Sequence, residues 1–252
     1  MRDVVGQFSA SAARYDQHSG IQRRTFEQLQ CLIPSGNYQQ ILDLGAGTGA
    51  MTRLLATEYP DAQITGIDAA PKMVMFAQSH YGTPKIHFEC GRFETFALAT
   101  KADLVVSNAT FQWVSEPEAA LAHLSHQMQS GAPLVMSAFG PETYRELAMV
   151  IRQVWGHPVI TSASRFLDGE SLHAAMTGAF SGVHVHQYRY QKQFDSLAAL
   201  LRSIKHTGTR GLPEGPKNWT PGLFREVEKA YVAHYREIMA TYQVFYCTAR
   251  CR

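Results

Sequence analysis

The sequence has few cysteines, and their spacing does not suggest a metal site. Four cysteines occur in 252 residues, at Cys31, Cys90, Cys247 and Cys251. No Cys-x-x-Cys pair is present, and Cys247 and Cys251 stand four apart with no nearby histidine pattern. Such cysteine usage is typical of reduced thiols in a cytosol, so we expect neither a zinc site nor another metal ion.

Long apolar runs are also missing. No segment approaches the roughly 20 consecutive apolar residues that a membrane-spanning helix needs. Residues 1–8 lack the apolar core of a signal peptide. With 45% hydrophobic and 17% charged residues, the composition is that of an ordinary globular protein. We therefore expect a cytoplasmic protein with no membrane partner.

The chain carries little excess charge of either sign. The formal net charge is +2, which is too close to neutral to indicate a nucleic-acid partner. One local cluster, formed by Arg202, Lys205, His206 and Arg210, is basic. Such a cluster is often only a solvated face of a helix. We expect no nucleic-acid partner.

Strand-like and helix-like segments alternate through the first half of the chain. Residues 19–33 have apolar positions at helical spacing, and a Pro-Ser-Gly sequence follows them. Strands are then predicted at 41–44, 64–68, 86–90, 104–107 and 133–139, and helices at 51–59, 73–80 and 116–129. This alternation predicts an α/β fold of βαβ units around a mainly parallel sheet.

The pattern changes after residue 140. Helices are predicted at 142–154, 169–180, 196–206 and 223–238, strands at 182–193 and 241–249, and a Gly- and Pro-rich loop at 207–221. We interpret the whole chain, 1–252, as one domain. It has a cofactor-binding core at about 38–140, a helical cover at 1–36, and a helical lid inserted at about 195–240.

A buried strand runs directly into a glycine-rich turn at residues 41–49, Ile-Leu-Asp-Leu-Gly-Ala-Gly-Thr-Gly. Glycine lets the backbone take a positive φ and approach a ligand closely. In open α/β sheets, ligands bind at the carboxyl ends of the strands. Gly45, Ala46 and Gly47 are therefore expected to contact a ligand. Asp68, at the end of the next strand, offers a carboxylate to ribose hydroxyls.

Two classes of nucleotide ligand compete for this turn. Dinucleotide folds use Gly-x-Gly-x-x-Gly, whereas the spacing here is Gly-x-Gly-x-Gly. Asp43, two residues before the first glycine, disfavours a phosphate and suits the ammonium of an amino-acid moiety. The pattern resembles the first motif of seven-stranded methyltransferases, which implies S-adenosylmethionine as the methyl donor and a Rossmann-like sheet with an antiparallel last strand.

Further cofactor residues follow from the same resemblance. Ala69 and Met73 come just after Asp68, and Met73 is placed against adenine or in the core. Arg92 and Phe93 follow the third predicted strand, where an acidic residue is common in related enzymes. Asn108 directly follows the fourth predicted strand, whose carboxyl end faces the methyl-donor sulfur in this superfamily.

The segment after the fourth strand narrows the resemblance. Residues 107–113 read Ser-Asn-Ala-Thr-Phe-Gln-Trp, which is similar to the malonyl-[acyl-carrier protein] O-methyltransferases of biotin synthesis. Four other segments are also similar to that family: 8–23, 164–167, 201–208 and 241–246. The resemblance thus runs nearly from end to end. It implies methylation of the free malonyl carboxylate at the start of pimeloyl and biotin synthesis.

This chemistry needs no general base, because a malonyl carboxylate has a pKa of about 4 or below. A closed aromatic pocket and a cationic anchor suffice to orient it. The predicted substrate residues are Tyr15, Gln112, Trp113, Arg165, Phe166 and His206. Arg165 or His206 is the candidate anchor. Tyr15 and Arg23 are expected to close over the methionine carboxylate of the cofactor.

The resemblance also implies a partner, an acidic acyl carrier protein that presents the malonyl group. A basic rim would steer it to the pocket. The candidates for this rim are Arg145, Arg202, Lys205 and Arg210. Malonyl-CoA as the substrate, a methyltransferase for another small carboxylic acid, and a non-catalytic protein that binds S-adenosylmethionine remain open alternatives.

Overall fold

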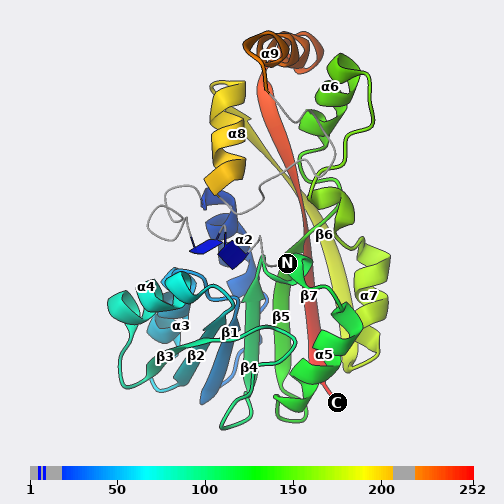
Figure 1. Ribbon diagram of the computed structural model, residues 1–252. Helices are drawn as coiled ribbons and strands as arrows, with labels where there is room; N and C mark the ends of the chain where they lie inside the picture. The colour runs from blue at the N-terminus through cyan, green and yellow to red at the C-terminus, as the bar shows by residue number, and fades with distance from the viewer. Residues whose placement is uncertain (1–4, 7, 10–18, 207–218) are drawn as a thin grey trace.

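One seven-stranded sheet forms the centre of the molecule (Figure 1). The computed structural model describes residues 5, 6, 8, 9, 19–206 and 219–252. The strand order is β3-β2-β1-β4-β5-β7-β6. The strands are β1 (Gln40–Leu44), β2 (Gln63–Asp68), β3 (Ile86–Cys90), β4 (Leu104–Asn108), β5 (Pro133–Phe139), β6 (Phe180–Phe194) and β7 (Ile238–Cys251). All neighbours from β3 to β5 pair in parallel, and β7 is antiparallel to both β5 and β6.

Helices cover both faces of this sheet. They are α2 (Gly20–Gln30), α3 (Ala50–Glu58), α4 (Pro71–Tyr81), α5 (Pro117–His126), α6 (Arg145–Trp155), α7 (Gly169–Thr177), α8 (Leu197–His206) and α9 (Pro221–Tyr235). Side chains alternate along each strand, so Ile41 and Leu42 of β1 enter different apolar clusters. Buried residues of α2 and α3 pack in the first cluster, and those of α5 and α7 in the second.

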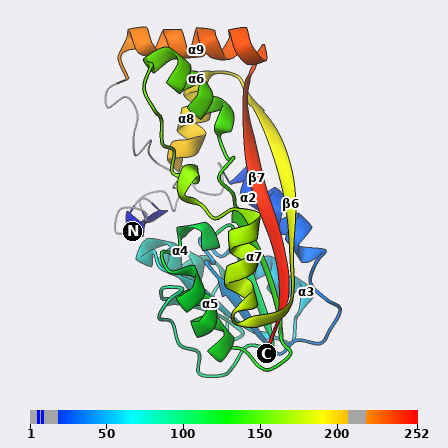
Figure 2. The ribbon, with the colours of Figure 1, turned by 90° about the vertical axis from the view of Figure 1, so that its right-hand side faces the viewer.

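Two long strands extend the molecule beyond the sheet. β6 and β7 pair along almost their whole length and rise past the carboxyl end of β5 (Figure 2). The connection between them contains α8 and α9, and α9 packs against α6 and β7 (Figure 1). These three helices form what we call the upper helical layer, α6, α8 and α9, above the carboxyl ends of the parallel strands.

The predicted boundaries were wrong mainly in this second half. The strands predicted at 182–193 and 241–249 extend to Phe180–Phe194 and Ile238–Cys251. The helix predicted at 169–180 ends at Thr177. The extra strand residues find their hydrogen-bond partners in each other, a long-range pairing that local hydrophobic pattern does not report. Two short 3₁₀ helices, Phe111–Trp113 and Ala163–Arg165, were also not predicted.

Among the described residues, no helix combines the length and hydrophobicity that crossing a bilayer would require.

Candidate active site

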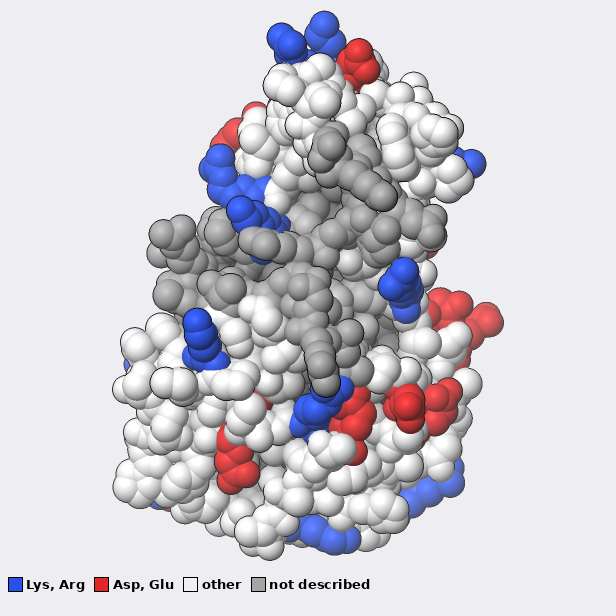
Figure 3. Space-filling view, in the orientation of Figure 1, with Lys and Arg blue, Asp and Glu red and all other residues white. Residues whose placement is uncertain are grey.

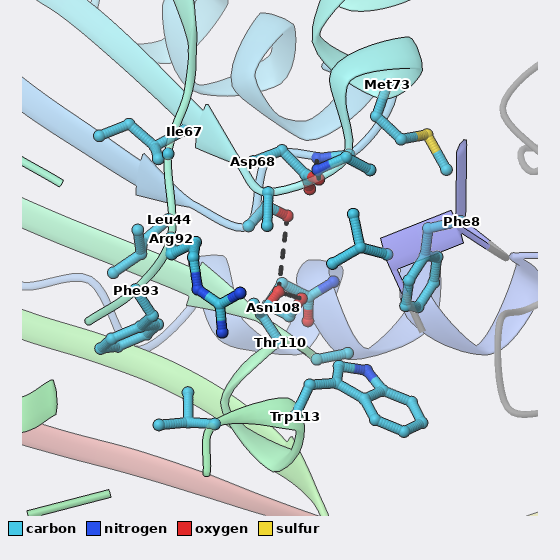
Figure 4. Close-up of a pocket in the computed structure, with 18 of the residues that line it drawn as sticks. Phe8, Leu44, Ile67, Asp68, Met73, Arg92, Phe93, Asn108, Thr110 and Trp113 are labelled. Atoms are coloured by element: carbon cyan, nitrogen blue, oxygen red, sulfur yellow. Dashed lines mark hydrogen bonds between the residues drawn. The ribbon is translucent and has the colours of Figure 1, made fainter. Parts of the chain in front are cut away.

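A cavity of about 860 Å³, open to solvent, lies at the carboxyl ends of β1, β2 and β4 (Figure 4). Its lining joins segments that are far apart in the sequence. Gly45 and Gly47 follow β1, Asp68 ends β2, and Asn108 ends β4. The structure therefore brings together the glycine turn and the acidic strand end that the sequence predicted as neighbours.

Gly47 has a backbone that only glycine adopts easily. Its φ is +56°, in the left-handed region, and a Cβ built on it would meet nothing within 4 Å. The space that a side chain would fill is thus part of the cavity. Gly45 has another reason to lack a side chain, because its Cβ would lie 2.0 Å from Thr110 Oγ1. The turn is shaped for close approach of a ligand at Gly47 and of Thr110 at Gly45.

Asp68 is held in place by the backbone on both sides of it. Its Oδ2 accepts from the Gly47 N–H at 2.9 Å, and its Oδ1 accepts from the Ala70 N–H at 2.8 Å. Burial raises the pKa of Asp68, while these two hydrogen bonds act to lower it. An ionised carboxylate has about four acceptor positions, so roughly two stay open toward the cavity. They fit the two hydroxyls of a ribose.

Asp43 takes a different position from the one expected. Its carboxylate is 3% exposed and accepts from Thr52 Oγ1 on α3 at 2.6 Å. It does not belong to the described lining of the cavity. Burial raises the pKa of Asp43 to about 6, the hydrogen bond from Thr52 lowers it, and the nearby Asp68 raises it further. Asp43 thus stands behind the glycine turn, with Thr52 rather than the cavity as its partner.

The cavity has apolar lining on two opposite sides, at Met73 and at Phe93, and one cation, Arg92, among its described lining residues. Met73 is 1% exposed and lines the cavity with Ala69 and Phe93. Phe93 packs edge-on against Phe111, with ring centroids 5.3 Å apart. Figure 4 shows Arg92 beside Phe93, with its guanidinium next to Asn108. The guanidinium of Arg92 also lies near Glu94, with Nε and Oε2 3.6 Å apart.

A strained turn follows β4. Ala109 has a φ of +52°, which is uncommon for a residue with a side chain. Its N–H donates to the carbonyl and hydroxyl oxygens of Ser137, both at 3.0 Å, and its carbonyl accepts from Gln112 Nε2 at 2.6 Å. The other end of the Gln112 amide accepts from the Phe139 N–H at 3.3 Å. Gln112 therefore ties this turn to the end of β5.

Aromatic side chains close the cavity next to Met73, since Phe8 packs against the cluster of Ala70 and Met73. Trp113 lines the cavity and packs edge-on against Phe8 and Phe166, with ring centroids 6.0 and 5.2 Å apart. Phe166 is buried and lies behind Trp113 rather than in the described lining. Arg165 and Gln112 line a second, smaller cavity of about 470 Å³, which shares Val114 with the first.

Other predicted site residues lie away from the cavity or outside the described residues. Arg23 is exposed on α2, and Ala46 is buried against Ala77 and Phe88. Tyr15 and Arg210 fall outside the described residues, as does the side chain of His206.

Thr110 was not predicted. Its hydroxyl lies 3.1 Å from the Asn108 carbonyl and 3.5 Å from the Gly45 carbonyl, a contact that follows only from pairing of β1 with β4.

The predicted basic rim is only partly available. Arg145 pairs with Glu142 and Glu146, each at 3.1 Å. Arg202 and Lys205 are exposed on α8. On the face shown in Figure 3, Lys and Arg side chains form separate groups rather than one continuous patch. In the part of the chain that the structure describes, no group of three His, Cys, Asp or Glu side chains could hold a metal ion.

Comparisons with known proteins agree with this architecture. Residues 41–131 match the family model described as "Methyltransferase domain". A malonyl-[acyl-carrier protein] O-methyltransferase of Paenibacillus sp. is 31% identical over 262 residues, covering 95% of this chain and 95% of the relative. The Bacillus anthracis protein of the same name is 29% identical over 250 residues, covering 95% of this chain and 93% of the relative.

Solved structures show the same fold at low sequence identity. The YcgJ protein of Bacillus subtilis has a TM-score of 0.63 at 14% identity, covering 91% of this chain and 99% of that chain. A putative methyltransferase of Bacillus halodurans has a TM-score of 0.62 at 12% identity, covering 90% of this chain and 98% of that chain. The predicted Rossmann-like methyltransferase sheet, with an antiparallel last strand, is thus confirmed.

Proposed function

Because this chain belongs to the family of malonyl-[acyl-carrier protein] O-methyltransferases and is an S-adenosylmethionine-dependent methyltransferase, we propose that it methylates the free carboxylate of a malonyl thioester. The observation that carries the proposal is similarity over 95% of the chain to relatives that are matched over 93% and 95% of their own length. The product would be a malonyl methyl ester on an acyl carrier protein, made at the start of pimeloyl and biotin synthesis.

The described cavity fits S-adenosylmethionine. Asp68 keeps acceptor positions for the ribose hydroxyls, and Gly47 leaves open space beside them. Met73 and Phe93 offer an apolar surface to adenine. When bound, the co-substrate supplies a methyl group on a positively charged sulfur. Asp43 is more than half ionised at pH 7, because its pKa is about 6, and its charge behind the turn favours a cationic ligand.

The remaining task of the protein is to orient the methyl acceptor. A malonyl carboxylate is already ionised at neutral pH, so no side chain has to remove a proton. Trp113, backed by Phe166 and Phe8, forms an aromatic wall that would limit water around the carboxylate. Holding the two reactants in line removes entropy from the barrier. Arg165, close to Val114 at the edge of the cavity, is our candidate for the carboxylate anchor.

The carrier protein would approach from the upper helical layer. Arg202 and Lys205 on the exposed side of α8 are the rim residues that the structure leaves most accessible. Arg145 is a weaker candidate, because two glutamates already pair with its charge. An acidic carrier protein would be attracted to α8 by these cations.

Labelled S-adenosylmethionine tests the proposal directly. The protein is incubated with the label and with malonyl, succinyl or acetyl thioesters of CoA or of an acyl carrier protein. Transfer of label to a base-labile ester of the malonyl thioester is expected, with none to acetyl, which has no free carboxylate. Preferred labelling of another acid would replace malonate as the substrate. Binding of the co-substrate without any transfer would instead favour a non-catalytic role.

A further inference from the structure

His184 and His186 stand side by side on β6, away from the candidate active site. They are two positions apart on one strand, so their side chains leave the same face of the sheet. Their ring centroids are 6.4 Å apart, and the ring planes are inclined by 14°. Both residues are exposed. Two imidazoles therefore face solvent together at one point of the surface.

The place of this pair in the sheet keeps space open beside it. β6 is the last strand in the sheet order, and β7 is its single neighbour in the part of the chain that the structure describes (Figure 2). An extra residue enters β6 between Ser181 and His184, where the register with β7 shifts, and Gly182 takes a φ of +58°. Such a bulge changes the direction of neighbouring side chains. The two rings thus lie on an outer strand that no further described strand covers.

Within the described residues, neither ring makes a hydrogen bond or an ion pair with the rest of the molecule. Other histidines are engaged in this way. His80 donates through Nδ1 to the Phe76 carbonyl at 2.8 Å, and His123 donates through Nε2 to the Phe96 carbonyl at 2.6 Å. A neutral imidazole has one unprotonated ring nitrogen, which is the atom that binds a metal ion. The pair on β6 thus offers two nitrogen ligands for which no described group competes.

The rings are close enough to meet on one ion. Zinc binds an imidazole nitrogen at about 2.0–2.1 Å, which places the centroids of two rings on one tetrahedral ion about 5 Å apart. The observed separation of 6.4 Å therefore has to shrink by about 1 Å. Exposed side chains change rotamer within picoseconds to nanoseconds, so this adjustment is easy. Since no third His, Cys, Asp or Glu of the described chain joins the pair, water would fill the other positions of the ion.

We propose that His184 and His186 form a two-ligand site for a late first-row divalent cation such as Ni²⁺, Cu²⁺ or Zn²⁺. Imidazole suits these ions, whereas Mg²⁺ and Ca²⁺ prefer oxygen ligands. It is a surface site and not a cofactor site for methyl transfer, because β5 and β7 separate β6 from the strand ends at the cavity. The expectation of no metal ion came from the spacing of cysteines, which does not bear on histidines of a strand.

Calorimetry of the untagged protein with NiCl₂ tests the site. One tightly bound Ni²⁺ ion per chain is expected, and MgCl₂ should give no binding. His184→Gln and His186→Gln should each weaken Ni²⁺ binding by about 100-fold or more, because the second imidazole no longer binds intramolecularly. His173→Gln removes another exposed histidine, on α7, and should leave the affinity unchanged.

Electron paramagnetic resonance of bound Cu²⁺ identifies the ligands. Nitrogen hyperfine coupling from two imidazoles is expected in the parent protein and from one imidazole in each single variant. Because both histidines are exposed, the two variants should unfold at the same temperature as the parent protein without metal.

A parent protein that binds no Ni²⁺ would overturn the proposal. Ni²⁺ binding that survives both substitutions together, or that falls equally in His173→Gln, would also overturn it, since the ion would then be bound elsewhere. A Cu²⁺ spectrum that is the same in the parent protein and in the single variants would count against the pair as ligands.

Discussion

Replacing Asp43 by Asn should change how the stability of this protein depends on pH. The Asp43 carboxyl is fully enclosed between β1 and α3, and its burial raises its pKa from 3.8 to about 6. Asn has nearly the same shape, can still accept from Thr52 through its oxygen, and does not ionise. The difference between the two proteins therefore reports the ionisation of Asp43 together with its coupling to Asp68.

The sign of the effect follows from proton binding. Between pH 3.8 and about 6, the folded state keeps a proton on Asp43 that the unfolded state has lost, so the free energy of unfolding falls as pH rises. Above pH 6 both states are ionised, and the contribution becomes constant. Because the pKa is raised from 3.8 to about 6, the free energy of unfolding is about 3 kcal/mol lower at neutral pH than at acid pH on account of this group.

Urea unfolding of both proteins between pH 4 and 8 measures this difference. The free energy of unfolding of Asp43→Asn minus that of the parent protein should rise by about 3 kcal/mol from acid to neutral pH. Most of this change should fall between pH 4 and 6. Titrating groups that do not interact with Asp43 are present in both proteins and cancel, whereas Asp68 does not, because its charge contributes to the raised pKa of Asp43. A difference that stays constant across this range, or one that grows in the opposite direction, would refute the reasoning.

Four further changes have distinct expected outcomes. Gly47→Val forces a side chain into a positive-φ backbone, so it should cost about 1–2 kcal/mol in urea unfolding and fill space that a ligand needs. Asp68→Asn should weaken S-adenosylhomocysteine and 5′-methylthioadenosine alike, by about tenfold or more, because both ligands contain the ribose; calorimetry showing a loss for only one would contradict its assignment. Gln112→Ala should lower the free energy of unfolding by about 1–3 kcal/mol, since two backbone groups lose their partner. Arg202→Glu combined with Lys205→Glu should raise KM for malonyl carrier protein but not for malonyl-CoA. An equal rise in KM for both substrates would exclude these two residues as a binding site for the carrier protein.

The first half of the fold was predictable because its signals are local. β1, β4 and β5 are short and almost continuously buried, and β2 and β3 are short strands with alternating burial. The glycine turn lies within a few residues of β1. The lengths of β6 and β7 were not predictable in this way. Their upper halves are stabilised by pairing with each other and by the upper helical layer, which the chain reaches only through long-range contacts.

In the site, the positions of residues could be predicted from the sequence, but the directions of their side chains could not. Asp68 and Gly47 were predicted as cavity residues and are found there, since strand ends and turns decide their positions. The direction of a side chain depends on its spatial neighbours instead. Asp43 turns to Thr52, and Gln112 holds backbone groups of its own turn and of β5. No pattern in the sequence reports such partners.

The central claim, methylation of a malonyl carboxylate, is tested most directly by the mass of the acceptor. Malonyl carrier protein is incubated with S-adenosylmethionine and this protein, and its intact mass is measured before and after treatment with mild base. The account predicts that one methyl group is gained on the malonyl arm, that base removes it, and that acetyl carrier protein gains none. An unchanged malonyl carrier protein in the presence of bound co-substrate, or an equal gain on the acetyl form, would contradict it.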